Sequence, residues 1–145
     1  MTESKLDSKP IKHVLVIDDD EITRRLAKAE LTDNGFSVDI VSGHQEALAY
    51  LQNHGATVDV IVSEITMPNG SGYQLLSQLR AQGCQIPYFL FSGNEEVTEE
   101  SALKMGANGF LRKPFKIGRL TVKIVLYFAQ EQNRLSAKNT LKKQD

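Results

Sequence analysis

Acidic side chains, a hydroxyl and a lysine stand where apolar stretches of the sequence end. Asp18 and Asp19 follow the first stretch, Glu64 closes a later one, and Ser92 and Lys113 follow two more. Carboxylates that gather at one place repel one another unless an ammonium group or a hard divalent ion such as Mg²⁺ neutralises them. A nearby hydroxyl adds a donor for an anionic oxygen. The combination indicates phosphoryl chemistry at an acidic side chain.

Apolar runs alternate with helical patterns along the chain. Runs rich in β-branched and aromatic residues predict buried strands, and apolar residues three or four positions apart predict the helices between them. The expected strands are residues 13–17, 36–41, 58–64, 87–91 and 109–112. The expected helices are residues 21–34, 44–54, 73–83, 94–106 and 117–129.

This alternation predicts an α/β fold, a doubly wound, flavodoxin-like (βα)5 sandwich with a parallel sheet in the strand order 2-1-3-4-5. Functional crevices of such sheets lie at the carboxyl ends of the strands. We therefore expect the five polar residues to converge there. The commoner fate of a lone glutamate beyond a strand, exposure to solvent, is the alternative for Glu64.

Three of the expected helices carry further detail. In the first, Ile22, Leu26 and Ala29 recur at helical spacing, and Asn34-Gly35 resembles a glycine C-cap. Asn94 is the expected N-cap of the fourth, whose early turns hold the glutamates 95, 96, 99 and 100.

The last helix has two apolar stripes, although one suffices for packing on a sheet. The first stripe is Leu120, Ile124 and Phe128, and the second is Val122, Val125, Leu126 and Ala129. We favour a broad contact with the core as the explanation, and the alternative is an exposed surface for a partner.

Composition limits the possible functions. The 145 residues, 41% of them hydrophobic, suit one domain, and a net charge of −1 gives no case for binding nucleic acid or a membrane surface. The sequence lacks a run of about 20 apolar residues and a signal-peptide core, so we expect a cytoplasmic protein. The single cysteine, Cys84, and the scattered histidines do not have metal-ligand spacing.

Domain limits follow from polarity. Residues 1–10 are expected to be a flexible tail and residues 11–130 the folded domain. Residues 131–145 are polar and are expected to be a helical extension or a tail.

Four motifs together resemble the receiver domain of two-component response regulators, over roughly residues 11–129. They are Val14-Leu15-Val16-Ile17-Asp18-Asp19, Glu64-x-x-Met67-Pro68 with Gly70 and Gly72 after it, Ser92-Gly93, and Lys113-Pro114-Phe115. Each motif alone is weak, but four in order at consistent spacing are specific.

The resemblance implies roles for individual residues. Asp18 and Asp19 would form an acidic pocket that binds Mg²⁺, with Glu64 and the backbone carbonyl of Thr66 as further ligands.

It also implies a switch. Ser92 would be the switch hydroxyl, Lys113 the lysine that pairs with the phosphoryl group, and Phe110 the aromatic residue that changes rotamer on activation. Partners would be a histidine kinase, an output domain, another signalling protein or a second copy. They would bind the face formed by residues 94–106, 109–112 and the last helix.

Glu64 departs from the pattern, because receiver domains have the phosphoryl-accepting aspartate at this position. One more methylene moves the carboxylate by roughly 1.5 Å, which in-line phosphoryl transfer tolerates badly. One hypothesis is an atypical receiver domain whose output needs no phosphorylation, in which Glu64 reaches Lys113 and mimics the phosphorylated state. The alternative is a degenerate receiver domain that serves as a scaffold.

An enzyme is the second class of function. Asp18 and Asp20 after an apolar strand also resemble the haloacid-dehalogenase-type phosphatases, in which the first aspartate is a nucleophile and the second an acid/base. That family requires another acidic motif after the lysine, and the first acid after Lys113 is Glu131. We therefore expect a signalling module rather than an enzyme.

Overall fold

Five parallel strands form the central sheet of the computed structural model, which describes residues 12–67, 70–116 and 118–144. The strands are β1 (His13–Ile17), β2 (Ser37–Val41), β3 (Val60–Glu64), β6 (Tyr88–Ser92) and β7 (Gly109–Arg112). Their order is β2-β1-β3-β6-β7. Counted along the chain this is 2-1-3-4-5, so the predicted doubly wound fold is confirmed.

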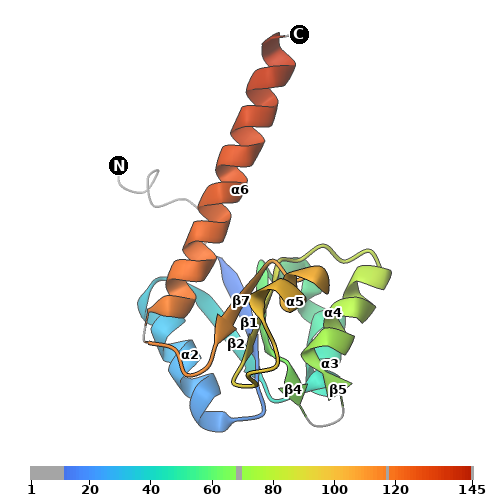
Figure 1. Ribbon diagram of the computed structural model, residues 1–145, viewed down its shortest axis with the longest axis vertical. Helices are drawn as coiled ribbons and strands as arrows, with labels where there is room; N and C mark the ends of the chain where they lie inside the picture. The colour runs from blue at the N-terminus through green and yellow to red at the C-terminus, as the bar shows by residue number, and fades with distance from the viewer. Residues whose placement is uncertain (1–11, 68–69, 117, 145) are drawn as a thin grey trace.

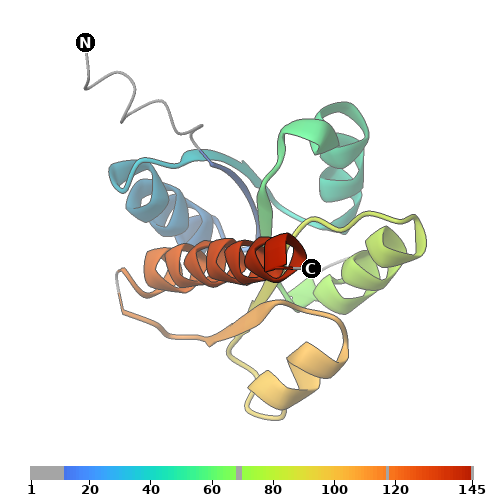
Figure 2. The same cartoon turned by 90° about the horizontal axis from the view of Figure 1, so that it is seen from above.

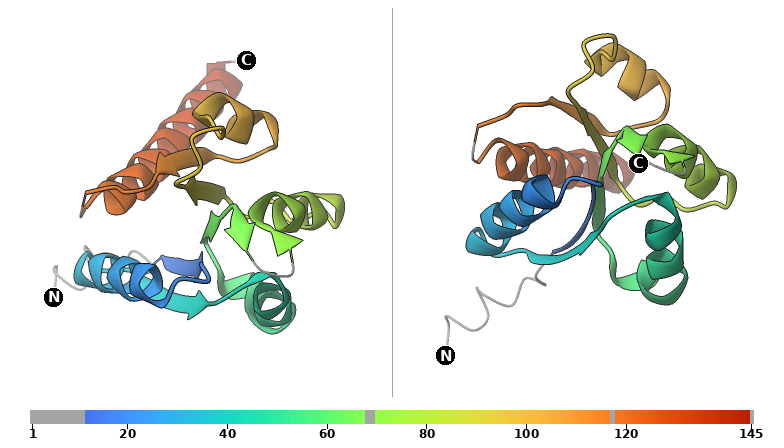
Figure 3. Two further views of the ribbon diagram at one scale, coloured as in Figure 1. Left: turned by 60° about the horizontal axis from the view of Figure 1, so that its bottom comes forward. Right: turned by 90° about the horizontal axis from the view of Figure 1, so that it is seen from below.

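Helices cover both faces of the sheet. They are α2 (Glu21–Asp33), α3 (His44–His54), α4 (Gly72–Ala81), α5 (Glu99–Lys104) and α6 (Arg119–Gln144). The helices α2 and α6 lie on one face, and α3, α4 and α5 lie on the other (Figures 2 and 3). Successive strand residues point to opposite faces, so the core consists of two apolar layers. Leu15 and Ile61 lie in the layer beneath α3 and α4, and Val16 and Val62 lie in the layer beneath α2 and α6.

Strand register brings the functional ends of the strands level with one another. Ile17 at the end of β1 pairs with Ser63, and Glu64 at the end of β3 pairs with Phe91. Ser92 pairs with Arg112, the residue before Lys113. Side chains that follow these strands therefore start from one edge of the sheet, as the strand order predicts.

The helix α2 forms where predicted, but its apolar positions differ from the expectation. Asp20 caps its start and Asn34 with Gly35 its end, where Gly35 adopts a φ of 91°. Ile22 and Leu26 are 68% and 61% exposed. The residues of α2 that face the protein are Ala27, Glu30 and Leu31. The spacing of Ile22, Leu26 and Ala29 thus predicted the helix correctly, but these residues lie beside the side of the helix that packs on the sheet.

The helix α5 begins later than predicted. Its N-cap is Thr98, which exchanges hydrogen bonds with Ser101 in a capping box, and the helix starts at Glu99. Asn94 instead accepts a hydrogen bond from the Glu96 backbone N–H in the preceding turn, at 3.0 Å. The prediction that Asn94 caps this helix was wrong. The capping box at Thr98 satisfies two backbone N–H groups at once, those of Thr98 and Ser101.

The helix α6 packs on the sheet through its first stripe and Tyr127. Leu120 and Ile124 are buried, whereas Val122, Val125 and Leu126 are about half exposed. The favoured broad contact with the core was therefore wrong for the second stripe.

The same helix continues through Gln144 and projects well beyond the sheet (Figure 1). The expected tail at residues 1–10 lies outside the described residues, and the domain limits at residues 11 and 130 stay a prediction. Among the described residues, no helix combines the length and the hydropathy that crossing a bilayer requires.

Candidate functional site

Three charged side chains meet at the carboxyl edge of the sheet. The Lys113 ammonium Nζ lies 2.7 Å from Asp18 Oδ2 and 2.9 Å from Glu64 Oε1. Asp18 is fully buried, the Glu64 side chain is 12% exposed and that of Lys113 is 21% exposed. One cation therefore bridges two carboxylates in a largely dry site, where charge interactions are stronger than in water.

The end of β1 positions Asp18. Its Oδ1 accepts a hydrogen bond from the backbone N–H of Asp20 at 2.8 Å, and its carbonyl oxygen accepts one from Arg24 at 2.7 Å. Asp20 is the N-cap of α2, and hydrogen bonding to Thr23 is the main reason that the pKa of Asp20 lies below its usual value. Both oxygens of Asp20 are thus engaged by the first turn of α2.

The end of β3 and the start of α4 position Glu64. Its Oε2 accepts a hydrogen bond from the backbone N–H of Ile65 at 2.7 Å, which leaves Oε1 for Lys113. Gly72 opens α4 directly against this strand, and a Cβ at Gly72 would lie 2.4 Å from the Glu64 carbonyl oxygen. Only glycine permits this approach without moving the backbone that carries Glu64.

Lys113 follows β7 and is held by its backbone and its side chain. Its N–H donates to the Ser92 carbonyl at 2.9 Å, and its Nζ lies 4.8 Å from the centre of the Phe91 ring. The peptide bond between Lys113 and Pro114 is cis. The ammonium thus has an aromatic face and two carboxylates around it, an arrangement that favours its charged form.

Burial and pairing act in opposite directions on these groups. Burial raises the pKa of Asp18 above its usual range, although the hydrogen bond and the charge of Lys113 oppose that rise. For Lys113, burial alone would lower the pKa, but the hydrogen bonds to Asp18 and Glu64 outweigh it and the pKa is raised. Lys113 is therefore a permanent cation, whereas Asp18 is the member of the site that is more easily protonated than usual.

Three further predicted residues, Asp19, Thr66 and Ser92, make no hydrogen bond or ion pair with the three charged side chains among the residues that the structure describes. Asp19 and Thr66 are exposed. The Ser92 hydroxyl oxygen accepts a hydrogen bond from the Asn94 backbone N–H at 3.0 Å. In the described part of the chain, we find no hydrogen bond from Ser92 or Asp19 to the side chains of Glu64 or Lys113.

Phe110, the predicted aromatic switch, is buried in β7. It is 5% exposed and belongs to the apolar layer that also contains Leu90 and Val97. Its ring also lies 5.2 Å from the guanidinium of Arg112, on the same strand. The side chain is therefore turned into the domain.

In this arrangement the Lys113 ammonium, and not a metal ion, neutralises Asp18 and Glu64, two of the ligands that the resemblance implies for Mg²⁺. Carboxylate and carbonyl oxygens do suit a hard cation. However, both carboxylate oxygens of Asp18 and of Glu64 already accept hydrogen bonds. Lys113 supplies the positive charge between them. Within the described ranges, no group of three or more histidine, cysteine, aspartate or glutamate side chains is arranged to hold a metal ion.

Two polar clusters were not predicted from the sequence. Glu30 is a buried carboxylate on α2 that binds the start of α6. The other cluster lies between the start of β1 and α3, where the Tyr50 hydroxyl contacts Asp39 and His13. The hydrogen bond to Asp39 lowers the pKa of that carboxyl group. The partners in both clusters are far apart in sequence, so no local pattern indicates them.

Comparison with known proteins agrees with the fold. Residues 14–125 match the response regulator receiver domain family. Regulatory protein VirG of Agrobacterium tumefaciens is 31% identical over 140 residues, which cover 95% of this chain and 51% of VirG. Transcriptional regulatory protein FixJ of Bradyrhizobium diazoefficiens is 35% identical over 113 residues, or 77% of this chain and 54% of FixJ. The chain spans about half the length of the relatives it matches.

Solved structures give the same result. The receiver domain of the Francisella response regulator 1452 has a TM-score of 0.75 at 30% identity, covering 83% of this chain and 98% of that one. Chemotaxis response regulator CheY4 of Vibrio cholerae has a TM-score of 0.73 at 28% identity, covering 81% and 99%. With the bridged carboxylates at the expected strand ends, these matches show that the chain belongs to the response regulator receiver domain family of two-component signalling.

Proposed function

We propose that this receiver domain is a cytoplasmic signalling module that works without phosphorylation. In this proposal the Glu64 carboxylate, paired with Lys113, takes the place of the phosphoryl group. The observation that carries the proposal is the Lys113 ammonium bridging Asp18 and Glu64 at 2.7 and 2.9 Å. A lysine already bound to a glutamate at the acceptor position no longer needs a phosphoryl group as its anionic partner.

Geometry supports a glutamate in this role, and its negative charge supports the role in part. The additional methylene extends the carboxylate by roughly 1.5 Å beyond the reach of an aspartate. Glu64 Oε1 thereby reaches Nζ of Lys113, which follows a strand two places away in the sheet. Glutamate carries one negative charge where a phosphoryl group carries about −1.5 to −2, so the replacement is electrostatically incomplete.

A second candidate function has one observation in its favour. The Ser92 hydroxyl oxygen accepts a hydrogen bond from the Asn94 backbone N–H. Ser92 is also the residue whose hydroxyl is expected to change partners when the acceptor at position 64 changes. A receiver domain whose switch hydroxyl does not interact with Glu64 would be a scaffold with a fixed shape.

Receiver domains interact with kinases and output domains. We place the partner surface of this chain on α5, β7 and α6. This surface contains large apolar side chains that are about half exposed. They are Leu103, Met105, Val122, Val125 and Leu126. Nζ of Lys123 on α6 lies 4.0 Å from Oε2 of Glu99 on α5, so the two helices are neighbours. Apolar side chains surrounded by charges of both signs suit a protein partner, either a second copy or another signalling protein.

Treatment with a small phosphodonor tests independence from phosphorylation. With acetyl phosphate and Mg²⁺, intact-mass spectrometry of the unaltered protein should show no stable addition of a phosphoryl group. The reason is that both Glu64 oxygens are engaged and the carboxylate is displaced from the position that in-line attack requires. Stoichiometric phosphorylation mapped to Glu64 would exclude the proposal. Phosphorylation mapped to Asp18 or Asp19 would equally contradict it.

A further inference from the structure

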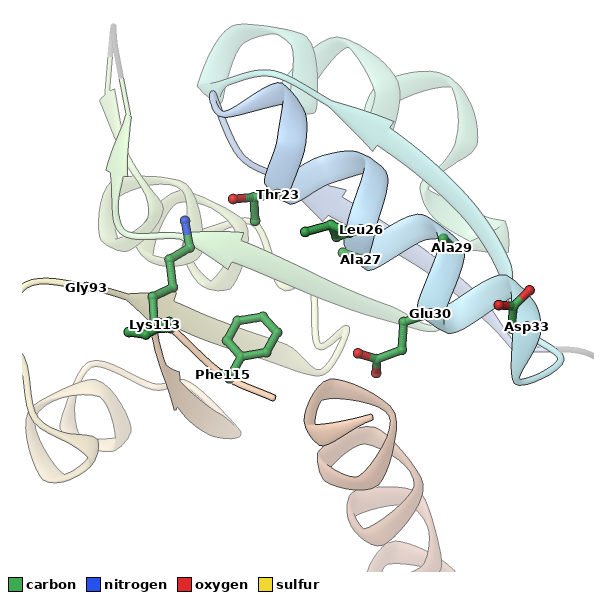
Figure 4. Close-up of a pocket in the computed structure, with 10 residues that line it drawn as sticks. Thr23, Leu26, Ala27, Ala29, Glu30, Asp33, Gly93, Lys113 and Phe115 are labelled. Carbon is green, nitrogen blue, oxygen red and sulfur yellow. The ribbon is translucent and has the colours of Figure 1, made fainter. Parts of the chain in front are cut away.

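Glu30 connects α2 to the start of α6. Its side chain is 9% exposed, and Figure 4 shows it reaching from α2 toward the first turn of α6. Oε1 accepts a hydrogen bond from the Gly118 backbone N–H at 2.9 Å. Oε2 accepts two, from the N–H and the hydroxyl of Thr121, each at 2.7 Å. Both oxygens of one buried carboxylate are thus devoted to the beginning of another helix.

The start of α6 depends on this distant residue. The first N–H groups of a helix have no partners within it, and a carboxylate near them is also favoured by the helix dipole. Gly118, immediately before the helix, has no side chain that could cap it and adopts a φ of 93°. Glu30, located 88 and 91 positions earlier in the sequence, supplies the cap instead.

The segment that joins Lys113 to α6 is held at both ends by the same unit. Lys113 is bound to Asp18 at the end of β1, and Gly118 is bound to Glu30 on the helix that follows β1. Between these anchors, the Phe115 ring packs edge-on against Phe91 at 6.2 Å.

A cavity of about 590 Å³ separates this segment from α2 (Figure 4). It is lined on the α2 side by Leu26, Ala27 and Ala29, and on the other by Pro114 and Phe115. Close packing normally fixes a segment's position. Pro114 and Phe115 face α2 across the cavity, so on this side the two anchors hold the segment, together with the contact between Phe115 and Phe91.

We propose that Glu30 is a positioning residue that couples the Glu64–Lys113 pair to α6. A change in the position of Lys113 pulls on a short segment whose far end Glu30 attaches to the first turn of α6, so α6 moves with the site. Without the cap, the segment would absorb the change. This inference rests on the proposed function, because it takes the Glu64–Lys113 pair as the group that carries the signal.

Hydrogen exchange tests the cap. In Glu30→Gln, one carboxylate oxygen becomes an amide N–H₂ that cannot accept from the α6 backbone. The remaining amide oxygen can face Gly118 or Thr121, so exchange of at least one of these two backbone amides should become faster by about tenfold or more, because a charge-assisted bond is lost. Thr121→Val removes only the hydroxyl bond and should produce a smaller increase. Asp33→Asn is the matched control on α2 and should change nothing in α6, since Asp33 is exposed. Unchanged exchange of both the Gly118 and the Thr121 amides in Glu30→Gln would overturn the proposal.

A double-mutant comparison tests the coupling itself. Glu64→Gln should move the amide resonances of Val125 and Leu126 when Glu30 is intact, and should move them much less in the Glu30→Gln background. Equal movement in both backgrounds, or none in either, would overturn the coupling. Neither result depends on phosphorylation, which the mass measurement on the unaltered protein decides separately. Failure of this inference and failure of the proposed function are therefore distinguishable.

Discussion

Glu64→Asp should convert the domain into an acceptor of phosphoryl groups. With acetyl phosphate and Mg²⁺, the variant should be modified at position 64 about 100-fold faster than the unaltered protein, because a displacement of about 1 Å in a reacting group can cost that factor. The shorter side chain withdraws from Lys113 and leaves its ammonium available for an incoming phosphoryl group. Time-resolved intact-mass spectrometry and peptide mapping measure the rate and the position.

Glu64→Gln is the control for this gain. It keeps the length of glutamate and removes the charge, so it should remain unmodified. If Glu64→Asp is as inert as the unaltered protein, the remaining site is defective, and the acceptor is not the element that sets this chain apart.

Lys113→Met should have the largest effect on stability. It leaves the buried carboxylates of Asp18 and Glu64 beside each other without a cation. Breaking a buried pair costs roughly 3–5 kcal/mol, and since Lys113 retains some solvent contact we expect about 2–4 kcal/mol of unfolding free energy to be lost. Urea denaturation measures the loss. Lys123→Met is the matched control, because its partner Glu99 is exposed and 4.0 Å away, and it should cost about 0.5 kcal/mol or less.

Dependence on pH shows whether Lys113→Met loses stability through the missing charge or through lost packing. Burial raises the pKa of Asp18 above its ordinary value of 3.8, so between 3.8 and the raised value the folded protein binds more protons than the unfolded chain. Stability contributed by this group therefore falls as pH rises through that window. Removing the Lys113 cation should extend the window upward, so the deficit of Lys113→Met should shrink on acidification. A deficit that is independent of pH would indicate lost packing of the lysine stem instead.

Strand positions were predictable because buried parallel strands are continuous apolar runs. β1 and β7 have the expected limits, and the strand order follows from right-handed crossovers. The same reasoning predicts that Asp18, Glu64 and Lys113 lie close together, and their side chains form two ion pairs. Long-range convergence could be predicted here because the topology itself brings strand ends to one edge.

Helix faces and caps were less predictable, because several patterns compete within one short segment. Ile22 and Leu26 have helical spacing yet face solvent, and Thr98 rather than Asn94 caps α5. The buried position of Glu30 was not predicted, because a glutamate between apolar helix residues normally faces solvent. Its partners Gly118 and Thr121 become neighbours only in the folded chain.

The details of the site also exceeded what the sequence could specify. Residue types indicated that a cation must neutralise Asp18 and Glu64, and they allowed either Lys113 or Mg²⁺ to do so. Hydrogen-bond geometry favours Lys113, since it engages one oxygen of each carboxylate while backbone N–H groups engage the others. The orientation of Ser92 likewise depends on a backbone partner that spacing alone does not reveal.

Amide chemical shifts test the central claim most directly. The spectrum of the unaltered protein should be compared with that of Glu64→Asp before and after treatment with the phosphodonor. If Glu64 stands in for a phosphoryl group, the resonances of β7 and α5 in the unaltered protein should match those of the phosphorylated variant. A match to the unphosphorylated variant, with the phosphorylated form set apart from both, would contradict the account.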